Sequence, residues 1–285
     1  MNILITGATG FIGKYLTKSL CSNHVVTVVV RDEAKARNTF GNSVNYLSTN
    51  SSSFSDELKN LKVDVVFHLA GNSSFNETSE VCQQLIEDNI QFGTLLLQGL
   101  SNSNMKLFVN FSSSLSFLEN EKHATNFYAS TKLAFTEVLN YFHSKSRFKV
   151  VDLVLYAVYG KGDTTKRAIN YVIDSIESTK PLLMSPGNQQ LDFIHVDDVI
   201  KLCGFCIDSM DGFESFSRIH VGTGISTSLR QLAVIVENEM GVKPNITWGG
   251  IPYRTNEKLI NVAPVHLNSF WKAEIKLNEG ILSMK

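Results

Sequence analysis

Three glycines follow the first apolar run of the chain at the spacing G-x-x-G-x-x-G, and they constrain the fold more than any other feature. The run Ile3–Thr6 is typical of a short buried strand, and Gly7, Gly10 and Gly13 come directly after it. The first glycine allows a backbone turn that residues with a Cβ atom cannot adopt. The second lets a pyrophosphate approach the backbone, and the third lets the next helix pack closely on the strand. We therefore expect a dinucleotide-binding turn; the alternative is an ordinary glycine turn.

The helix expected after this turn carries apolar side chains four residues apart, at Ile12, Leu16 and Leu20. That spacing places them on one face, as a helix that lies on a sheet requires. The first turn of such a helix offers unpaired N–H groups and the positive end of its dipole, and both favour phosphate. The residues that we assign to the phosphate-binding turn are Gly7, Thr9, Gly10, Phe11, Ile12 and Gly13.

The size and charge of the chain exclude several classes of function. It has 285 residues, of which 43% are hydrophobic, and this is enough for one or two closely packed domains. Its formal net charge of −1 gives no electrostatic case for nucleic acid or an anionic membrane. No apolar run approaches the roughly 20 residues of a membrane span, and the first apolar stretch is interpreted as a strand rather than a signal peptide. We expect a cytoplasmic protein with no nucleic-acid or membrane partner.

The four cysteines are scattered along the chain, at Cys21, Cys82, Cys203 and Cys206, and suggest no disulfide framework. Cys203 and Cys206 form a C-x-x-C within a segment that is apolar nearly all round. We interpret both as core thiols, with a redox pair as the alternative. No second pair is present to complete a zinc site, and we expect no bound metal.

Short runs rich in valine and isoleucine alternate with helix-length segments through about the first 160 residues. This alternation is typical of a parallel sheet covered by helices on both faces. A polar, loop-like segment covers Ser48–Ser55. The expected strands are Ile3–Thr6, Val25–Val30, Val44–Leu47, Val63–Leu69, Leu107–Phe111 and Val151–Tyr156. The expected helices lie near 11–21, 79–103, 127–146, 165–179, 196–209 and 228–240.

These elements predict an α/β fold with a Rossmann-type, doubly wound parallel sheet and a smaller C-terminal substrate lobe. We expect the dinucleotide-binding domain to span 1–160, with a return segment near 191–222. The smaller lobe would consist of 161–190 and 223–285. It would cover the carboxyl edge of the sheet, where sheets of this kind bind their ligands.

The end of the second strand indicates which dinucleotide is bound. In NAD-binding folds an acid about 20 residues beyond the glycines holds the ribose 2′-hydroxyl, whereas Val25–Val30 is followed by Arg31. The guanidinium of Arg31 would pair with a 2′-phosphate, and this contact would strengthen dinucleotide binding roughly ten- to hundredfold. Arg37 would add a second contact to the same phosphate. We therefore predict NADP(H). Two alternatives are that Asp32, one residue later, acts as the acid, and that Arg31 simply lies at a solvated strand end.

Tyr128 and Lys132 form a Y-x-x-x-K on a predicted helix, where a spacing of four places both side chains on one face. A free tyrosine titrates near pH ~10, and a neighbouring ammonium together with a positively charged nicotinamide would favour the phenolate. Tyr128 would then act as a general acid, worth roughly 10²–10⁴ in rate. The alternative is a chance Tyr/Lys pair on a helix surface.

A serine run, Ser112 to Ser114, follows the apolar strand Leu107–Phe111. A hydroxyl at this strand end can hydrogen-bond the same substrate oxygen that Tyr128 protonates. We predict that Ser114 has this role, with Ser113 as the alternative. An ordinary serine-rich turn is the purely structural interpretation.

Together these motifs resemble those of the extended short-chain dehydrogenase/reductases, specifically the nucleotide-sugar epimerase/dehydratase/reductase group. The resemblance covers nearly the whole chain. The further motifs that carry it are Phe67-His68-Leu69-Ala70-Gly71, Asn89-Ile90-Gln91-Phe92-Gly93-Thr94 (similar to the family's N-x-x-G-T), Tyr156-Ala157-Val158-Tyr159-Gly160, Asp192-Phe193-Ile194-His195-Val196-Asp197-Asp198 and Val221-Gly222-Thr223-Gly224.

The resemblance implies roles for residues that the spacing alone does not assign. Arg254 occupies the place of a diphosphate-binding arginine, and His68 and His195 are expected to be structural. A homodimer formed through the helices near 79–103 and 127–146 is also implied. The residues that would lie along the cofactor are Asn50, Leu69, Ala70, Gly71, Tyr128 and Lys132.

The chain departs from the family pattern in ways that narrow its activity. Dehydratases of this group carry an acidic pair after the catalytic hydroxyl, whereas Leu115 and Ser116 follow Ser114, so 4,6-dehydration is not expected. The interval from Ser114 to Tyr128 is short, which indicates a trimmed substrate lid. The family's arginine before D-F-I-H-V is Leu191 and its asparagine before V-Y-G is Ala157, which weakens detailed inference about substrate contacts. Trimmed members of this kind resemble NDP-4-keto-6-deoxyhexose 4-reductases.

The leading hypothesis is an NADPH-dependent reductase that acts on the C4 keto group of a nucleotide-linked 4-keto-6-deoxy sugar, in deoxysugar biosynthesis of the O-antigen type. Ser113 or Ser114 and Arg254 would bind the substrate. One alternative is a 4-epimerase that retains NAD. Another is a non-catalytic NADP-binding regulator with the same fold.

Overall fold

The computed structural model describes residues 1–285 except 118–123, 166, 256, 265–269 and 285. The chain forms two compact units. The first consists of Met1–Val154 and Ile200–Ile219, and the second of Leu155–Val199 and His220–Lys285. The glycine turn and the three residues predicted to be catalytic all belong to the first unit.

A seven-stranded sheet forms the centre of the first unit, in the order β11-β6-β5-β4-β1-β2-β3. β1 pairs in parallel with β2 and β4, β2 with β3, and β4 with β5. This order confirms the predicted doubly wound fold, in which the winding reverses between β1 and β4. The strands are β1 (Asn2–Thr6), β2 (Val25–Val30), β3 (Asn45–Ser48), β4 (Val65–His68), β5 (Leu107–Ser113), β6 (Lys149–Leu155) and β11 (Phe216–Val221).

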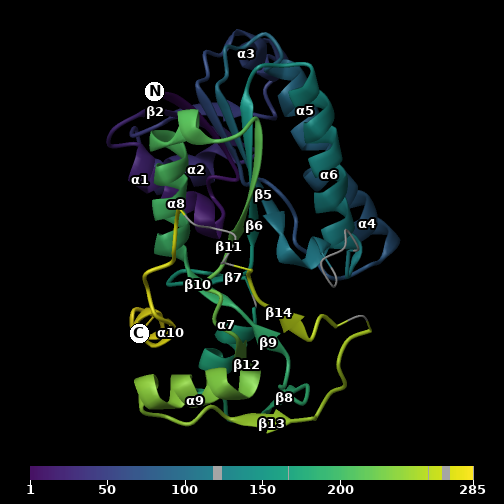
Figure 1. Ribbon diagram of the computed structural model, residues 1–285, viewed down its shortest axis with the longest axis vertical. Helices are drawn as coiled ribbons and strands as arrows, with labels where there is room; N and C mark the ends of the chain where they lie inside the picture. Colours follow the sequence, from purple (N-terminus) through teal and green to yellow (C-terminus); the bar gives the residue numbers. More distant parts are fainter. Residues whose placement is uncertain (118–123, 166, 256, 265–269, 285) are drawn as a thin grey trace. The chain divides into compact units, whose positions relative to one another are not determined.

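Helices cover both sides of this sheet, with α5 and α6 on one side and α1 and α8 on the other (Figure 1). On the side of α5 and α6, Leu96, Phe135 and Leu139 pack with Val66 and Phe108 of the sheet in one buried cluster. Burying side chains of this size contributes about 1.5–3 kcal/mol each. The helices are α1 (Phe11–Leu20), α2 (Glu33–Phe40), α3 (Phe54–Asn60), α4 (Ser79–Ile86), α5 (Phe92–Gly99), α6 (Phe127–Ser144) and α8 (Val196–Asp208).

The helix predicted near 79–103 is interrupted by a π-helical turn, η1 (Glu87–Gln91), between α4 and α5. The family pattern N-x-x-G-T places two residues between asparagine and glycine, whereas three lie between Asn89 and Gly93. A single π-helical turn is the usual way for a helix to contain an extra residue. We attribute the bulge to this insertion.

Two short helices, α2 and α3, have too little apolar periodicity to be predicted from the sequence. α2 buries Ala36 and Phe40, and α3 buries Leu58. The loop expected over Ser48–Ser55 is shorter in the structure, because β3 includes Ser48 and α3 begins at Phe54.

The second unit has a separate apolar core, in which Tyr159, Phe193, Leu232 and Ile281 are almost fully buried. Its strands form small sheets, β10-β7, β12-β9-β14 and β13-β8. The helix predicted near 165–179 is confined to α7, and residue 166 of that prediction lies outside the described residues. The elements are β7 (Ala157–Tyr159), α7 (Ala168–Asp174), β8 (Leu182–Met184), β9 (Gln190–Leu191), β10 (Phe193–His195), β12 (Thr227–Ser228), α9 (Leu229–Met240), β13 (Ile246–Trp248), β14 (Ile260–Asn261) and α10 (Leu277–Leu282).

The contact between α5 and α6 gives a prediction about stability. A Cβ on Gly93 would collide with the ring of Phe135 and lie 3.0 Å from Nε2 of His68. Gly93→Ala should therefore lower the free energy of unfolding by about 1–3 kcal/mol, as overpacking does. Gly204→Ala in α8 is the control. Its Cβ would meet no described atom within 4 Å, so better helix propensity should raise stability by up to about 1 kcal/mol. Urea unfolding measures both; equal effects would contradict this account of the interface.

Candidate functional site

The glycines of the first turn have different steric requirements, and one of them faces open space. Gly7 has φ +70°, and a Cβ built on it would lie 2.6 Å from the backbone nitrogen of Ala70. A Cβ on Gly13 would collide with the carbonyl oxygen of Gly7. At Gly10, which is exposed, the nearest described atom to a built Cβ is the Gly7 oxygen at 3.1 Å. Gly10 therefore leaves the backbone open to an approaching phosphate.

The N-terminus of α1 has the chemistry of an anion site. Gly10 is its N-cap residue and, as a glycine, supplies no side-chain cap for the N–H groups of the first turn. The helix dipole also favours negative charge at this end. The residues present therefore fit the pyrophosphate of a dinucleotide, with the backbone of Phe11, Ile12 and Gly13 as donors and Thr9 in the preceding turn.

Hydrogen bonds tie the end of β4 to the end of β1 beside this turn. Thr6 Oγ1 accepts from the backbone nitrogen of Ala70 at 3.1 Å and lies 2.9 Å from Nδ1 of His68. The His68 ring packs 4.9 Å from the Phe135 ring, centre to centre. Burial, helped by the charge of Lys132, lowers the pKa of His68 to about 3. His68 is neutral at physiological pH and holds the strand ends together, as expected of a structural residue.

A buried amide, Asn89 of the π-helix, joins three elements around the predicted catalytic lysine. Its Oδ1 accepts from the backbone nitrogen of Asn72 at 2.7 Å. Its Nδ2 donates to the Asn72 carbonyl at 2.9 Å and to Thr131 Oγ1 at 2.8 Å. Lys132, the next residue of α6, is 5% exposed, and its Nζ lies 3.8 Å from a Cβ built on Gly71. The ammonium is therefore held beside the segment that follows β4.

The protonation of Lys132 depends on burial and on a charge in the sheet. Burial lowers the pKa of Lys132 to about 8, and the negative charge of Asp152 opposes that shift. Asp152 is fully buried in β6. Its Oδ2 accepts from Arg218 Nε and its Oδ1 from Asn110 Nδ2, both at 2.9 Å. The lysine is thus a cation at neutral pH that loses its proton in mildly alkaline solution.

The serine run lies at the end of β5, and the turn that follows it is bonded to α6 through Ser116. β5 ends at Ser113, and a 3₁₀ helix, η2 (Ser114–Ser116), follows. The Ser113 hydroxyl caps this turn by accepting from the Leu115 backbone nitrogen at 3.2 Å. Ser114 is 2% exposed at its start, and Ser116 Oγ donates to the Ala129 carbonyl at 3.1 Å. The turn that carries Ser114 is therefore fixed to the first turn of α6.

Tyr128 is half-buried in that first turn of α6. The side chain of Asn126 caps the helix by accepting from the Ala129 backbone nitrogen at 2.8 Å. The Tyr128 ring lies 6.1 Å from the ring of Phe75, centre to centre. The structure therefore places Ser114, Tyr128 and Lys132 in one unit, on elements that hydrogen-bond to one another. Their chemical roles remain predictions. Residues 118–123 of the predicted short lid lie outside the described residues.

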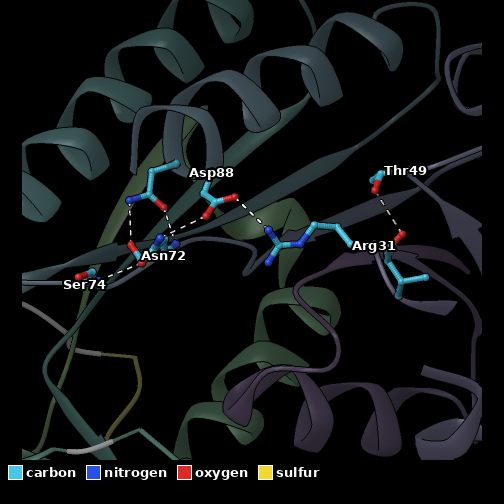
Figure 2. A network of polar contacts seen from close by, with 7 residues as sticks. Arg31, Thr49, Asn72, Ser74 and Asp88 are labelled. Atoms are coloured by element: carbon cyan, nitrogen blue, oxygen red, sulfur yellow. Dashed lines mark hydrogen bonds and ion pairs between the residues drawn. The ribbon is translucent and has the colours of Figure 1, made fainter. Parts of the chain in front are cut away.

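At the end of β2, Arg31 extends its side chain toward the π-helix. Its Nη1 lies 3.3 Å from Oδ1 of Asp88 (Figure 2), and its side chain is 78% exposed. Asn50 Nδ2 donates to the Arg31 carbonyl at 2.8 Å. Asp32, the alternative acid, is the N-cap of α2 and accepts from the Lys35 backbone nitrogen at 2.9 Å. Asp32 therefore already has a structural role.

Arg37 has partners on α2 and β3. Its Nη2 lies 2.6 Å from Oε1 of Glu33, and its guanidinium carbon lies 4.3 Å from the centre of the Tyr46 ring. The second phosphate contact predicted for Arg37 would require its guanidinium to leave these partners.

In the second unit, the D-F-I-H-V motif has a structural role. Asp192 is fully buried. Its carboxylate accepts from the backbone nitrogen and Oγ1 of Thr223 and from the backbone nitrogens of Gly224 and Ala263, at 2.7–3.1 Å. His195 is buried too, and burial lowers its pKa. Arg254, the predicted diphosphate ligand, is exposed between β13 and β14 of this unit.

The cysteine pair is unsuited to redox chemistry. Cys203 and Cys206 are buried in α8, where burial raises the pKa of both thiols, that of Cys206 to about 12. Within the described ranges, no cluster of three His, Cys, Asp or Glu side chains could hold a metal ion. Nor does any helix of those ranges have the length and apolar character to span a bilayer.

Several polar residues of the site are not evident from the sequence. Asn72, Asp88 and Thr131 follow no recognised motif, and Asn89 belongs to one without an assigned role. Their contacts link positions 16 to 57 residues apart, as in Asn72–Asp88 and Arg31–Asp88. No local pattern of residues could have paired them.

The glycine turn, the Y-x-x-x-K helix and the doubly wound sheet define a nicotinamide-dependent class of protein, and the comparisons identify the family. The model of the "NAD dependent epimerase/dehydratase family" matches residues 3–222, so the chain belongs to this family. It is 26% identical to a CDP-abequose synthase of Yersinia pseudotuberculosis over 99% of both chains. It is 28% identical to the CDP-abequose synthase of Salmonella typhimurium, over 98% of this chain and 95% of the relative.

Solved structures with lower sequence identity share the fold. UDP-glucuronic acid 4-epimerase from Bacillus cereus, in complex with UDP-glucuronic acid and NAD, superposes with a TM-score of 0.88 at 20% identity, over 100% of this chain and 98% of that one. UDP-glucose 4-epimerase from Thermus thermophilus, in complex with NAD, gives 0.83 at 20% identity, over 100% and 97%.

The open face of Gly10 gives a prediction about binding. Gly10→Ala should leave the thermal stability nearly unchanged, with a loss of about 1 kcal/mol at most, because its Cβ meets little besides the Gly7 oxygen. The same methyl group covers the backbone where the pyrophosphate would lie, so dinucleotide affinity should fall about tenfold or more. Calorimetric titration with NADPH and NADH measures this loss. Unchanged affinity for both would show that the turn is only structural.

Proposed function

We propose that this protein is an NADPH-dependent reductase of the C4 keto group of a nucleotide-linked 4-keto-6-deoxy sugar. One observation supports this most directly: the first unit combines an open glycine turn with Ser114, Tyr128 and Lys132 on elements bonded to one another. The nearly full-length similarity to CDP-abequose synthases supports a deoxysugar substrate. The product would then serve deoxysugar and polysaccharide synthesis.

The cofactor assignment rests on Arg31. Asp32 caps α2, whereas Arg31 is exposed at the end of β2, where a guanidinium would pair with a 2′-phosphate. The glycine turn would hold the pyrophosphate, and Asn50, Leu69, Ala70 and Gly71 would line the remaining length of the dinucleotide. When bound, NADPH supplies the hydride that reduces C4.

The side chains of the site would supply the proton that the C4 oxygen gains during reduction. Tyr128 donates its phenolic proton to the C4 oxygen, which becomes the hydroxyl of the product, and the phenolate left on Tyr128 regains a proton from solvent. Ser114 donates a hydrogen bond to the same oxygen and orients the carbonyl. Lys132, buried beside Gly71, stabilises the phenolate through its positive charge. Arg254 would neutralise the substrate diphosphate.

Ser114 is the leading candidate for the hydroxyl that binds substrate, with Ser113 as the alternative. The Ser113 oxygen accepts from the Leu115 backbone nitrogen and caps η2, which leaves its own O–H able to donate. Ser114 begins that turn, which Ser116 fixes to α6.

A homodimer formed through α4, α5 and α6 remains part of this proposal. Ile86 of α4, Leu95 of α5 and Tyr141 of α6 are large side chains at 45%, 49% and 62% exposure, and a partner surface would cover them.

The second candidate is a 4-epimerase that retains NAD, and it is favoured by the fold shared with 4-epimerases solved with NAD. NADPH absorbance with CDP-, GDP- and dTDP-linked 4-keto-6-deoxyhexoses, with NADH in parallel, separates the two. Stoichiometric oxidation of NADPH by one nucleotide sugar would support the reductase. Interconversion of 4-epimeric sugars without added cofactor would replace it with the epimerase.

Removal of the proton donor should separate catalysis from binding. Tyr128→Phe should lower the reduction rate by about 10²-fold or more, because the C4 oxygen loses its general acid. NADPH affinity should stay within about twofold, since the change leaves Lys132 and the glycine turn intact. Tyr171→Phe, at an exposed position of α7 outside the proposed dimer surface, is the control and should keep full activity. Full activity of Tyr128→Phe would refute the assigned role.

The buried lysine gives a prediction about pH. Burial lowers the pKa of Lys132 to about 8, so the cation is present below that pH and lost as the pH rises through it. The rate of 4-keto reduction should therefore fall above about pH 8, because a neutral amine no longer stabilises the phenolate. The pH profile of kcat/KM measures this. A rate that increases through this range would contradict the role of Lys132.

A further inference from the structure

Arg31, the proposed 2′-phosphate ligand, forms an ion pair with a carboxylate of the same chain, that of Asp88. Its Nη1 lies 3.3 Å from Oδ1 of Asp88, which lies on the π-helix between α4 and α5. The two side chains point toward each other across the space between the end of β2 and the π-helix (Figure 2). The Arg31 side chain is 78% exposed, whereas that of Asp88 is 20% exposed.

The carboxylate is the fixed partner of this pair. Asp88 Oδ2 accepts from Nδ2 of Asn72 at 3.3 Å. Asn72 is in turn held by Asn89, which accepts from its backbone nitrogen at 2.7 Å and donates to its carbonyl at 2.9 Å. The backbone of Arg31 is fixed through its carbonyl by Asn50, but its long, exposed side chain is free to change rotamer. A competing anion would therefore draw the guanidinium away from Asp88.

We propose that Asp88 competes with the 2′-phosphate of NADPH for Arg31 and so sets how strongly the protein prefers NADPH over NADH. This inference rests on the NADPH-dependent function proposed above. In this proposal the incoming 2′-phosphate draws the Arg31 guanidinium away from Asp88 and brings a second anion near that carboxylate. NADH carries no such phosphate, so Arg31 keeps its partner when NADH binds.

The neighbouring acid on the π-helix provides a matched control. Glu87 accepts a hydrogen bond from Gln83 Nε2 at 2.9 Å, one helical turn before it. Glu87→Gln therefore removes the same charge as Asp88→Asn from the same element. It leaves the pair between Arg31 and Asp88 in place.

The test is calorimetric titration of the full chain with NADPH and with NADH. Asp88→Asn should tighten NADPH binding by about three- to tenfold, as the loss of one exposed ion pair and one nearby repulsion predicts, and leave NADH binding unchanged. Glu87→Gln should change neither. Weaker or unchanged NADPH binding in Asp88→Asn would overturn the inference, since it would mean that Asp88 orients Arg31 or has no effect. Thermal unfolding checks that both variants fold.

A second pair of variants separates this inference from the proposed function. Arg31→Gln should weaken NADPH binding about tenfold or more without affecting NADH. Asp88→Asn should then have no effect in the Arg31→Gln background, because the residue for which it competes is absent. If Arg31→Gln leaves NADPH binding unchanged, the cofactor assignment itself is wrong and the inference falls with it. If Arg31→Gln weakens NADPH binding while Asp88→Asn alone changes nothing, only the inference is wrong.

Discussion

The close approach of the first turn to the segment after β4 is the constraint on which the candidate site depends. A Cβ on Gly7 would come 2.6 Å from the Ala70 backbone nitrogen, so the two segments meet only because Gly7 has no side chain. Thr6 fixes the contact by accepting from that same nitrogen. This joins β1 and β4 where the winding of the sheet reverses. Gly10 and the start of α1 come directly after this contact in the chain.

Polar contacts between side chains and backbone hold the other elements of the site together. Asn89 bonds the segment after β4 to α6, which carries the lysine, and Ser116 bonds η2 to the same helix. Each bond joins groups that would be costly to bury unpaired. The π-helix carries both Asp88, which pairs with Arg31, and Asn89, which bonds Thr131.

The sequence predicts well the parts of the fold that local patterns encode. The apolar runs predict six of the seven strands of the sheet, and β2 agrees with its prediction residue for residue. The edge strand β11 (Phe216–Val221) was not predicted. The short helices α2 and α3 were not predicted because they bury only Ala36 and Phe40, and Leu58, respectively. So few buried residues form no apolar periodicity in the sequence. Motifs locate Ser114, Tyr128 and Lys132, but the partner of Arg31 lies 57 residues away on a helical bulge. Such a contact depends on tertiary structure, which no local motif records.

We propose that the protein transfers a hydride from NADPH to C4 of its substrate and releases the reduced sugar. Reaction of a 4-keto-6-deoxy nucleotide sugar with NADPH that carries deuterium at the transferred position tests this. We expect one deuterium at C4 of each product molecule, with an equal amount of NADP⁺ formed. A 4-epimeric product without deuterium, formed while the labelled NADPH remains unconsumed, would contradict it.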